Sequence, residues 1–152
     1  MNTRPNKLTI SLGADHGGVD TKDGIAEHLR QKGYNVIDRG THGHDSVDYP
    51  NFAKAVAEDI VSKKADFGVL VCTTGIGISI AANKVHGIRA AVVYNADTAS
   101  LARRHNGANI ICMGGNYTSV ETGIAWTDIF LNTAFEGGRH QRRVDEITTM
   151  EE

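Results

Sequence analysis

The chain alternates short apolar runs with longer segments in which apolar residues recur at helical spacing. The short runs are rich in Val and Ile and are bounded by Gly, Asp or Asn, so we expect them to be buried strands. They cover residues 8–12, 36–37, 67–72, 89–93 and 109–113. The longer segments carry an apolar stripe at i, i+3 and i+4, which predicts helices. They cover residues 20–32, 51–63, 76–85, 97–105 and 120–130.

Strand and helix alternate at the spacing of βαβ units, which predicts an α/β fold with a five-stranded parallel sheet and helices on both faces. One long polar connection, residues 39–50, contains His42, His44, Asp45 and Tyr49. Connections of this length in compact domains are often functional. The tail from residue 136 onward is strongly charged, and we expect it to reach out to a neighbouring molecule.

Composition excludes several classes of function without identifying one. The chain has 152 residues, which fits one domain, and its formal net charge of −2 argues against nucleic-acid or membrane-surface binding. No apolar run approaches the ~20 residues that span a bilayer. Residues 1–7 are polar and lack a signal-peptide core, so a cytoplasmic location is expected. Cys72 and Cys112 each end an apolar run and are expected to be free thiols.

Ligands of parallel sheets bind beyond the carboxyl ends of the strands, so the residues that follow the strands are candidates for a site. The first strand is followed by Asp15, His16 and two glycines, and the third ends in Cys72-Thr-Thr-Gly-Ile-Gly. His105 and Asn106 follow the fourth helix. We expect these groups to converge on one cleft.

The turn from Cys72 into the next helix offers unpaired backbone N–H groups, which stabilise an oxyanion or a phosphate. The same field lowers the pKa of an adjacent thiol from about 8.5 toward neutrality. A thiolate beside an oxyanion hole is suited to proton abstraction next to a carbonyl. The alternative is a buried structural cysteine before a glycine turn. The turn does not satisfy the dinucleotide pattern G-x-G-x-x-G.

Three further motifs each allow two interpretations. Asp15 and His16 can assist proton movement and anion binding, or Asp15 can simply cap a helix. Arg139 and Arg143 share a helical face and can grip one phosphate, or they belong to an exposed basic tail. The stretch from His42 to Asp45 resembles a metal-binding fragment but lacks a third ligand at suitable spacing, so no metal site is predicted there.

Taken together, these motifs resemble ribose-5-phosphate isomerase type B, in the family that also holds the galactose-6-phosphate isomerase subunits. The similarity spans nearly the whole chain in the family's order. It rests on Gly13–Gly18, Asp48–Pro50, Thr74–Lys84, Gly87–Ala90, Arg104–Asn106 and Glu136–Val144.

The resemblance implies a single sugar-phosphate isomerase domain over residues 1–152 with a C-terminal extension, folded as a Rossmann-like three-layer sandwich. It also implies a homodimer or tetramer with active sites at the subunit interface, using no cofactor and no metal. By position, Cys72 resembles the base that moves a proton between C1 and C2. Thr74 and Asp15 resemble helpers in ring opening, and His105 resembles the ring-opening histidine that the partner subunit supplies.

The remaining matched positions resemble substrate-binding residues. Tyr49 resembles a sugar contact, and Asn106 lies beside the ring-opening histidine. By the same resemblance, the family's phosphate ligands correspond to His16, Arg139 and Arg143. The family's cradle for the enediolate oxygen corresponds to the turn amides of Gly75, Ile76, Gly77 and Ser79.

Two positions depart from the family pattern. Many members have glycine where this chain has Thr73, and a positive φ there would be costly for a β-branched residue. Many members also carry an arginine that reaches the phosphate where this chain has Asn116. Both departures bear on the substrate more than on the reaction.

The leading hypothesis is therefore an aldose–ketose isomerase of a small sugar phosphate, most simply ribose 5-phosphate to ribulose 5-phosphate through a cis-enediolate. The same chemistry on a tetrose or hexose phosphate, galactose 6-phosphate or a free aldose is the alternative. A nucleotide- or flavin-binding module would need a phosphate loop after the first strand, where Asp15 and His16 stand. A non-catalytic subunit of a hetero-oligomer would not need Cys72.

Overall fold

In a computed structural model, which describes residues 8–152, a five-stranded parallel sheet has the strand order β2-β1-β3-β5-β4. The expectation about residues 1–7 lies outside the described residues. All five predicted strands are confirmed, with ends shifted by a residue or two. They are β1 (Thr9–Ala14), β2 (Asn35–Asp38), β3 (Phe67–Cys72), β4 (Ala90–Val92) and β5 (Ile110–Gly114).

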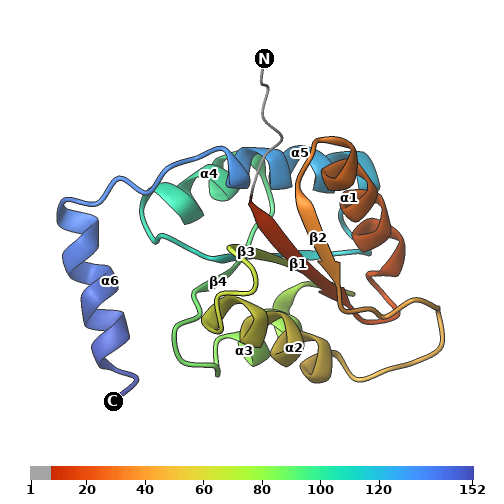
Figure 1. Ribbon diagram of the computed structural model, residues 1–152, viewed down its shortest axis with the longest axis horizontal. Helices are drawn as coiled ribbons and strands as arrows, with labels where there is room; N and C mark the ends of the chain where they lie inside the picture. Colours follow the sequence, from red (N-terminus) through yellow and green to blue (C-terminus); the bar gives the residue numbers. More distant parts are fainter. Residues whose placement is uncertain (1–7) are drawn as a thin grey trace.

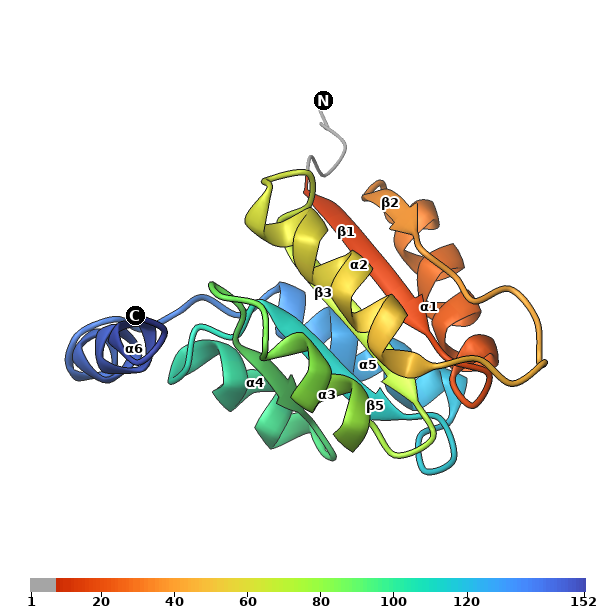
Figure 2. The ribbon, with the colours of Figure 1, turned by 90° about the horizontal axis from the view of Figure 1, so that it is seen from below.

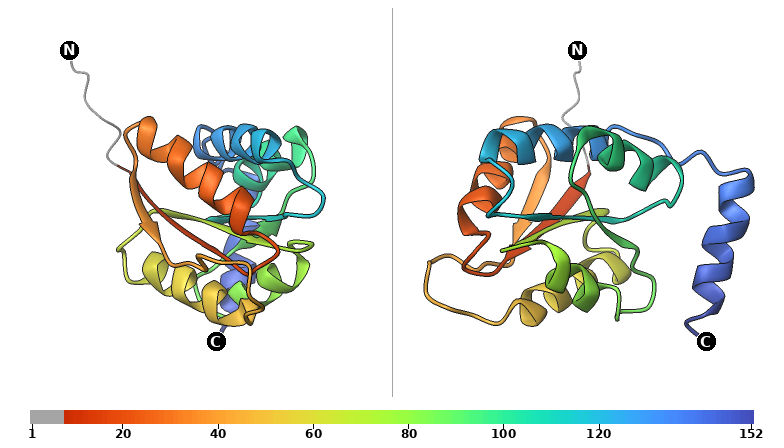
Figure 3. Two further views of the ribbon diagram at one scale, coloured as in Figure 1. Left: turned by 90° about the vertical axis from the view of Figure 1, so that its right-hand side faces the viewer. Right: turned by 180° about the vertical axis from the view of Figure 1, so that it is seen from behind.

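Helices cover both faces of the sheet, as the pattern predicts (Figure 1). One face packs against α1 (Val19–Gln31), α4 (Ala96–Arg104) and α5 (Val120–Leu131). The other packs against α2 (Tyr49–Val61) and α3 (Ile76–Ala82). The left view of Figure 3 shows the sheet between these two layers. The central strands are buried on both sides, which explains why they read as continuous apolar runs.

The strand order sets the position of the site. From β1 the chain moves outward to β2 and then crosses back to place β3 on the other side of β1. The loops that follow β1 and β3 therefore leave the sheet side by side at its carboxyl edge. This is the topological switch point, where open α/β sheets bind ligands.

The charged tail forms a sixth helix, α6 (Arg139–Thr149), which stands apart from the body (Figures 1 and 2). It touches the body near both of its ends. His140 stacks on His105, and Glu151, just after the helix, accepts a hydrogen bond from the Gly87 N–H at 2.9 Å. Its apolar residues Ile147 and Met150 remain exposed.

Two partly buried ionic networks connect helices to the sheet. The fully buried Lys22 ammonium donates to Asp38 at 2.8 Å and to Asp23 at 2.7 Å. Asp59 accepts from Arg39 at 2.6 and 2.8 Å and from the Ser11 hydroxyl at 2.7 Å. Burial raises the pKa of the Asp59 carboxyl, but these donors outweigh it and hold the pKa below its usual value.

Candidate active site

Three loops at the carboxyl edge of the sheet pack against one another through their backbones. The Gly115 N–H donates to the Cys72 carbonyl at 2.7 Å, and the Asn116 N–H donates to the Thr73 carbonyl at 3.2 Å. A Cβ added at Gly17 would lie 2.4 Å from Thr73 Oγ1, and one added at Gly115 would lie 2.2 Å from the Gly17 carbonyl oxygen. The loops after β1, β3 and β5 thus form a single floor without room for side chains between them.

Cys72 lies in this floor, at the end of β3, and only 4% of it is exposed. The Gly75 N–H donates to its Sγ at 3.1 Å. Gly75 reaches this position in the left-handed conformation, at φ +82°, where a Cβ would lie 2.8 Å from the Met113 carbonyl carbon. The left-handed turn thus holds an amide N–H against the Cys72 sulfur.

Only some of the backbone N–H groups in the turn after Cys72 donate hydrogen bonds to other atoms of the described chain. The Ile76 N–H donates to Thr74 Oγ1 at 3.2 Å, and the Ser79 N–H donates to the Gly75 carbonyl at 3.3 Å. The Gly77 N–H has no acceptor within the described chain. It therefore remains available to an oxygen of a ligand.

The loop after β1 places Asp15 and His16 beside this turn. Asp15 is buried, and its Oδ1 accepts from the Gly17 N–H at 2.9 Å. The alternative that Asp15 caps α1 is wrong, because Gly18 occupies the N-cap. His16 Nδ1 accepts from the Val47 N–H at 3.2 Å, which ties the long polar connection to the site. Sequence reasoning missed Val47, since a backbone donor leaves no compositional signal.

Tyr49 also belongs to the carboxyl edge, but it starts α2 rather than lying in the preceding connection as predicted. The helix begins two residues earlier than predicted because Pro50 fits its first turn. The Tyr49 ring lies over Gly77, where a Cβ would come within 2.6 Å of Cζ. The ring thus covers the turn that contains the free amide.

His105 and Asn106 do not join Cys72 within the single chain, so the convergence of these groups on one cleft stays a prediction. A helix that follows a parallel strand runs back across the sheet, so the C-terminal end of α4 lies at the amino edge. His105 caps that end, five residues before β5 begins at Ile110. Cys72 is paired with Gly114, at the other end of β5. Arg139 and Arg143 lie on α6, also away from the carboxyl edge (Figure 2).

At the amino edge, His105 contacts a cluster that sequence reasoning missed. Its ring stacks on that of His140, with centroids 4.3 Å apart and planes 13° apart. Glu136 accepts from Arg104 at 2.7 Å, and this hydrogen bond lowers the pKa of Glu136. Burial lowers the pKa of His140, and the positive charges of its neighbours add to that effect. The spacing of His140, Val144 and Ile147 was the available signal for an inward face on α6.

The two departures from the family pattern lie next to each other. Within residues 8–152, Lys63 is the one non-glycine residue with positive φ, so Thr73 avoids the strained conformation. Asn116 is exposed and hydrogen-bonds the Thr73 backbone. The predicted absence of a metal site between His42 and Asp45 stays a prediction; His44 Nε2 there lies 3.0 Å from Asp20 Oδ1, with both side chains exposed.

Comparison with known proteins places this α/β fold among the sugar-phosphate isomerases that interconvert aldoses and ketoses. The chain belongs to the Ribose/Galactose Isomerase family, whose model matches residues 10–147. This confirms the resemblance drawn from its motifs.

Individual relatives agree over nearly their full lengths. Ribose-5-phosphate isomerase B of Escherichia coli is 43% identical over 143 residues, covering 94% of this chain and 96% of the relative. The structure of the Clostridium thermocellum ribose-5-phosphate isomerase B superposes with a TM-score of 0.93 at 48% identity, covering 95% of this chain and 97% of that one. The Mycoplasma genitalium enzyme with bound ribulose-5-phosphate gives a TM-score of 0.91 at 41% identity, covering 97% and 98%.

Across residues 8–152, no helix combines the length and the apolar character needed to traverse a bilayer.

Proposed function

We propose that this chain converts ribose 5-phosphate to ribulose 5-phosphate through a cis-enediolate, with Cys72 as the base. The observation that carries the proposal is the position of Cys72 at the switch point, where its thiol accepts a hydrogen bond from the Gly75 N–H. The names of the relatives, all of sugar-phosphate isomerases, support the substrate class.

The groups around Cys72 suit the separate steps of this reaction. Thr74 and Asp15 assist opening of the sugar ring. Cys72 then removes the proton from C2 and, after exchange with solvent, returns a proton to C1, while the negative charge develops on the enediolate oxygen. Of the amides of Gly75, Ile76, Gly77 and Ser79, that of Gly77 is best placed to stabilise the oxygen, because its N–H has no acceptor in the described chain, whereas the other three donate to atoms of the same turn. Tyr49 covers the sugar, and His16 binds the phosphate.

The site is completed by a second copy of the chain. His105, Asn106, Arg139 and Arg143 lie at the amino edge, where they cannot reach Cys72 of the same subunit. In a homodimer they face the partner's carboxyl edge, with His105 opening the sugar ring and the two arginines binding the phosphate. Pairing of such dimers into tetramers is compatible with the same contacts.

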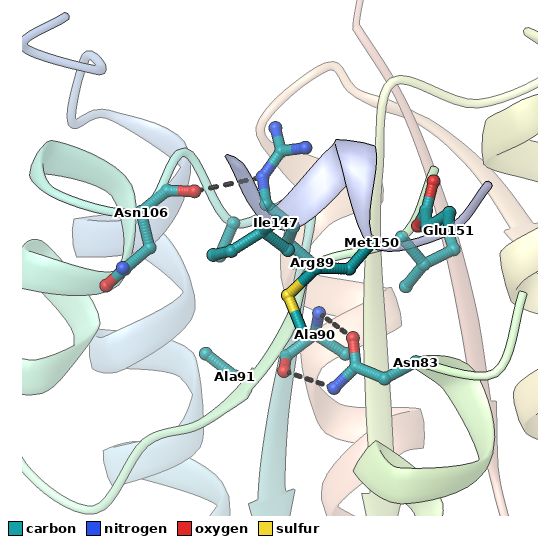
Figure 4. A pocket seen from close by; sticks show the side chains of 10 residues that line it. Asn83, Arg89, Ala90, Ala91, Asn106, Ile147, Met150 and Glu151 are labelled. Atoms are coloured by element: carbon teal, nitrogen blue, oxygen red, sulfur yellow. Dashed lines mark hydrogen bonds between the residues drawn. The ribbon is translucent and has the colours of Figure 1, made fainter. Parts of the chain in front are cut away.

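The shape of α6 supports this assembly. Between α6 and the body lies a cavity of about 410 Å³, lined by residues from α3, β4 and the end of α6 (Figure 4). Ile147 and Met150 face it with exposed apolar surface, and Asn106 lies at its other wall. A helix held at two points around an apolar cavity is typical of an arm that packs on a partner subunit.

The same chemistry on another sugar is the second candidate, and Asn116 favours it. Asn116 is exposed at the carboxyl end of β5 and offers a neutral amide where many family members have an arginine. Without that positive charge, a phosphate is bound less tightly at this position.

An isomerisation assay tests the proposal. The purified protein is given ribose 5-phosphate, a tetrose phosphate, galactose 6-phosphate, another hexose 6-phosphate and free ribose, and ketose formation is measured. We expect the highest kcat/KM with ribose 5-phosphate, and deuterium incorporation into the product in deuterium oxide. A clear preference for another sugar would show that the proposed substrate is wrong and that the proposed reaction type is right. Turnover of none of them would refute the proposal.

A further inference from the structure

The junction of α4 and α6 brings three metal-binding side chains together. His105 caps α4, Glu136 lies in the connection that follows α5, and His140 lies in the first turn of α6. One ligand atom from each residue lies within 4.8 Å of the other two. No other three His, Cys, Asp or Glu side chains in residues 8–152 meet in this way.

His140 supplies a second and independent observation. Its side chain is only 8% exposed, and its Nε2 is buried without a hydrogen-bond partner. The nearest acceptor, Glu136 Oε1, is 3.5 Å away, too far for a good hydrogen bond. A buried imidazole nitrogen in a native protein is normally satisfied, so this one has a coordination position to fill.

We propose that His105, Glu136 and His140 bind one divalent transition-metal ion, Zn²⁺ or Co²⁺, at this junction. Two imidazole nitrogens and one carboxylate oxygen are ligands that both ions accept, and three protein ligands leave a fourth position for water. Arg104 holds Oε2 of Glu136 at 2.7 Å, which leaves Oε1 directed toward His140.

Binding requires one ring to turn. The imidazoles stack with their planes 13° apart, and an ion cannot lie in both planes in that arrangement. His105 is half-buried and is the ring with freedom to rotate, whereas His140 is buried. Bonds of about 2.1 Å also require the ligand atoms to close to roughly 3.4 Å. The charges of Arg104, Arg139 and Arg143 oppose a cation. The site therefore binds more weakly than a preformed structural zinc site.

Metal binding has a consequence that rests on the proposed function. If His105 opens the sugar ring in the partner's site, an ion on His105 removes its free nitrogen and stops ring opening. Zn²⁺ then acts as a reversible inhibitor, and a chelator restores activity.

Titration of the full-length, metal-free protein with Co²⁺ tests the site, with binding followed by visible absorption and by calorimetry. We expect one ion per subunit. Loss of an outer partner of a metal ligand costs about 10–100-fold in affinity, so Glu136→Gln and His140→Ala should each weaken binding at least that much. His28→Ala is the matched control, because His28 also contacts a carboxylate, that of Asp128, at 2.9 Å but outside the cluster.

Unsaturable binding, or equal loss of affinity in Glu136→Gln and His28→Ala, would overturn the site. Glu136 is exposed enough that its substitution keeps the fold even if His140→Ala does not. Turnover of ribose 5-phosphate without metal tests the proposed function separately. Stoichiometric Zn²⁺ binding with undiminished turnover would refute the inhibitory consequence while leaving the site in place.

Discussion

At the scale of single residues, the two cysteines show how neighbouring thiols can have different surroundings. Both point to the α2–α3 side of the sheet, from adjacent strands. Burial raises the pKa of the Cys112 thiol far above its usual value, and the neighbouring Cys72 adds to that effect. Cys112 therefore stays protonated, whereas Cys72 lies at the strand end with the Gly75 amide on its sulfur.

We predict that Cys72→Ala retains the fold and lowers kcat by about 10²–10⁴, the usual effect of losing a general base. Solvent-hydrogen exchange at the substrate carbon should be lost with it. Cys112→Ala is the matched control and should alter stability more than kcat, since it removes a fully buried sulfur from the core. Steady-state kinetics with circular dichroism distinguish the two, and near-normal turnover by Cys72→Ala would rule out its role as base.

A second residue-scale prediction concerns Asn116. A charge-assisted hydrogen bond contributes about 1.5–3 kcal/mol, so Asn116→Arg should lower KM for ribose 5-phosphate by roughly ten- to a hundred-fold. Asn116→Gln controls for side-chain length without charge. A wild-type KM already in the low micromolar range, unchanged by arginine, would show that the position does not set specificity.

At the scale of elements, Asp59 joins α2 to β1 and to the chain after β2 through Ser11 and Arg39. Its side chain is 4% exposed, whereas that of Arg39 is 38% exposed. The network holds the start of the connection that carries Val47 to His16.

Asp59→Asn should therefore destabilise the protein at neutral pH by about 2–3 kcal/mol, below the ~3–5 kcal/mol of a fully buried pair because Arg39 reaches solvent. The folded-state pKa of Asp59 is lowered, so its contribution is present above the unfolded value and is lost as pH falls through the folded pKa. The difference in unfolding free energy should be constant above about pH 5 and shrink on further acidification.

Urea unfolding between pH 2 and 7 measures this difference. Asp45→Asn, at an exposed position in the 39–48 connection, is the control and should stay close to wild type throughout. A wild-type-to-Asp59→Asn difference that does not change with pH would mean that the ionised carboxylate is not what stabilises the network.

The sequence predicts helices and strands wherever burial imposes a regular spacing of apolar residues. The five strands and the helices between them alternate regularly, so their positions could be predicted. The helix α6 could not be predicted in the same way, because only His140 and Val144 on it are buried and its other residues have the composition of a charged tail. The carboxyl-edge groups Asp15, His16 and Cys72 could be located from chain order alone. The same reasoning could have located His105, because a helix between two parallel strands ends at the amino edge of the sheet, away from Cys72.

At the scale of the whole molecule, the candidate residues divide into two groups separated by the length of the strands. One group surrounds Cys72, and the other lies on α6 and at the end of α4 (Figure 3, right). In the proposed dimer, each active site takes one group from each subunit.

We predict that mixing inactive Cys72→Ala with inactive His105→Ala restores activity through hybrid dimers. Each hybrid contains one site with both residues intact, so random exchange should recover roughly a quarter of wild-type activity per subunit. The readout is turnover after subunit exchange, verified by native mass spectrometry on tagged chains. A mixture that exchanges subunits yet stays inactive would mean that both residues serve the same subunit's site.

The floor that the loops after β1, β3 and β5 form around Cys72 also has a consequence for how the family can diversify. Positions 18, 114 and 115 admit no side chain, because backbone atoms of neighbouring segments lie within 3 Å of where a Cβ would be. New sugar preferences must therefore arise at the rim, where Thr73, Asn116 and the 39–48 connection surround Cys72, the proposed base. A directed-evolution library should leave the three glycines untouched and randomise the rim, and most of its members should keep the ability to enolise a substrate while differing in which one they accept.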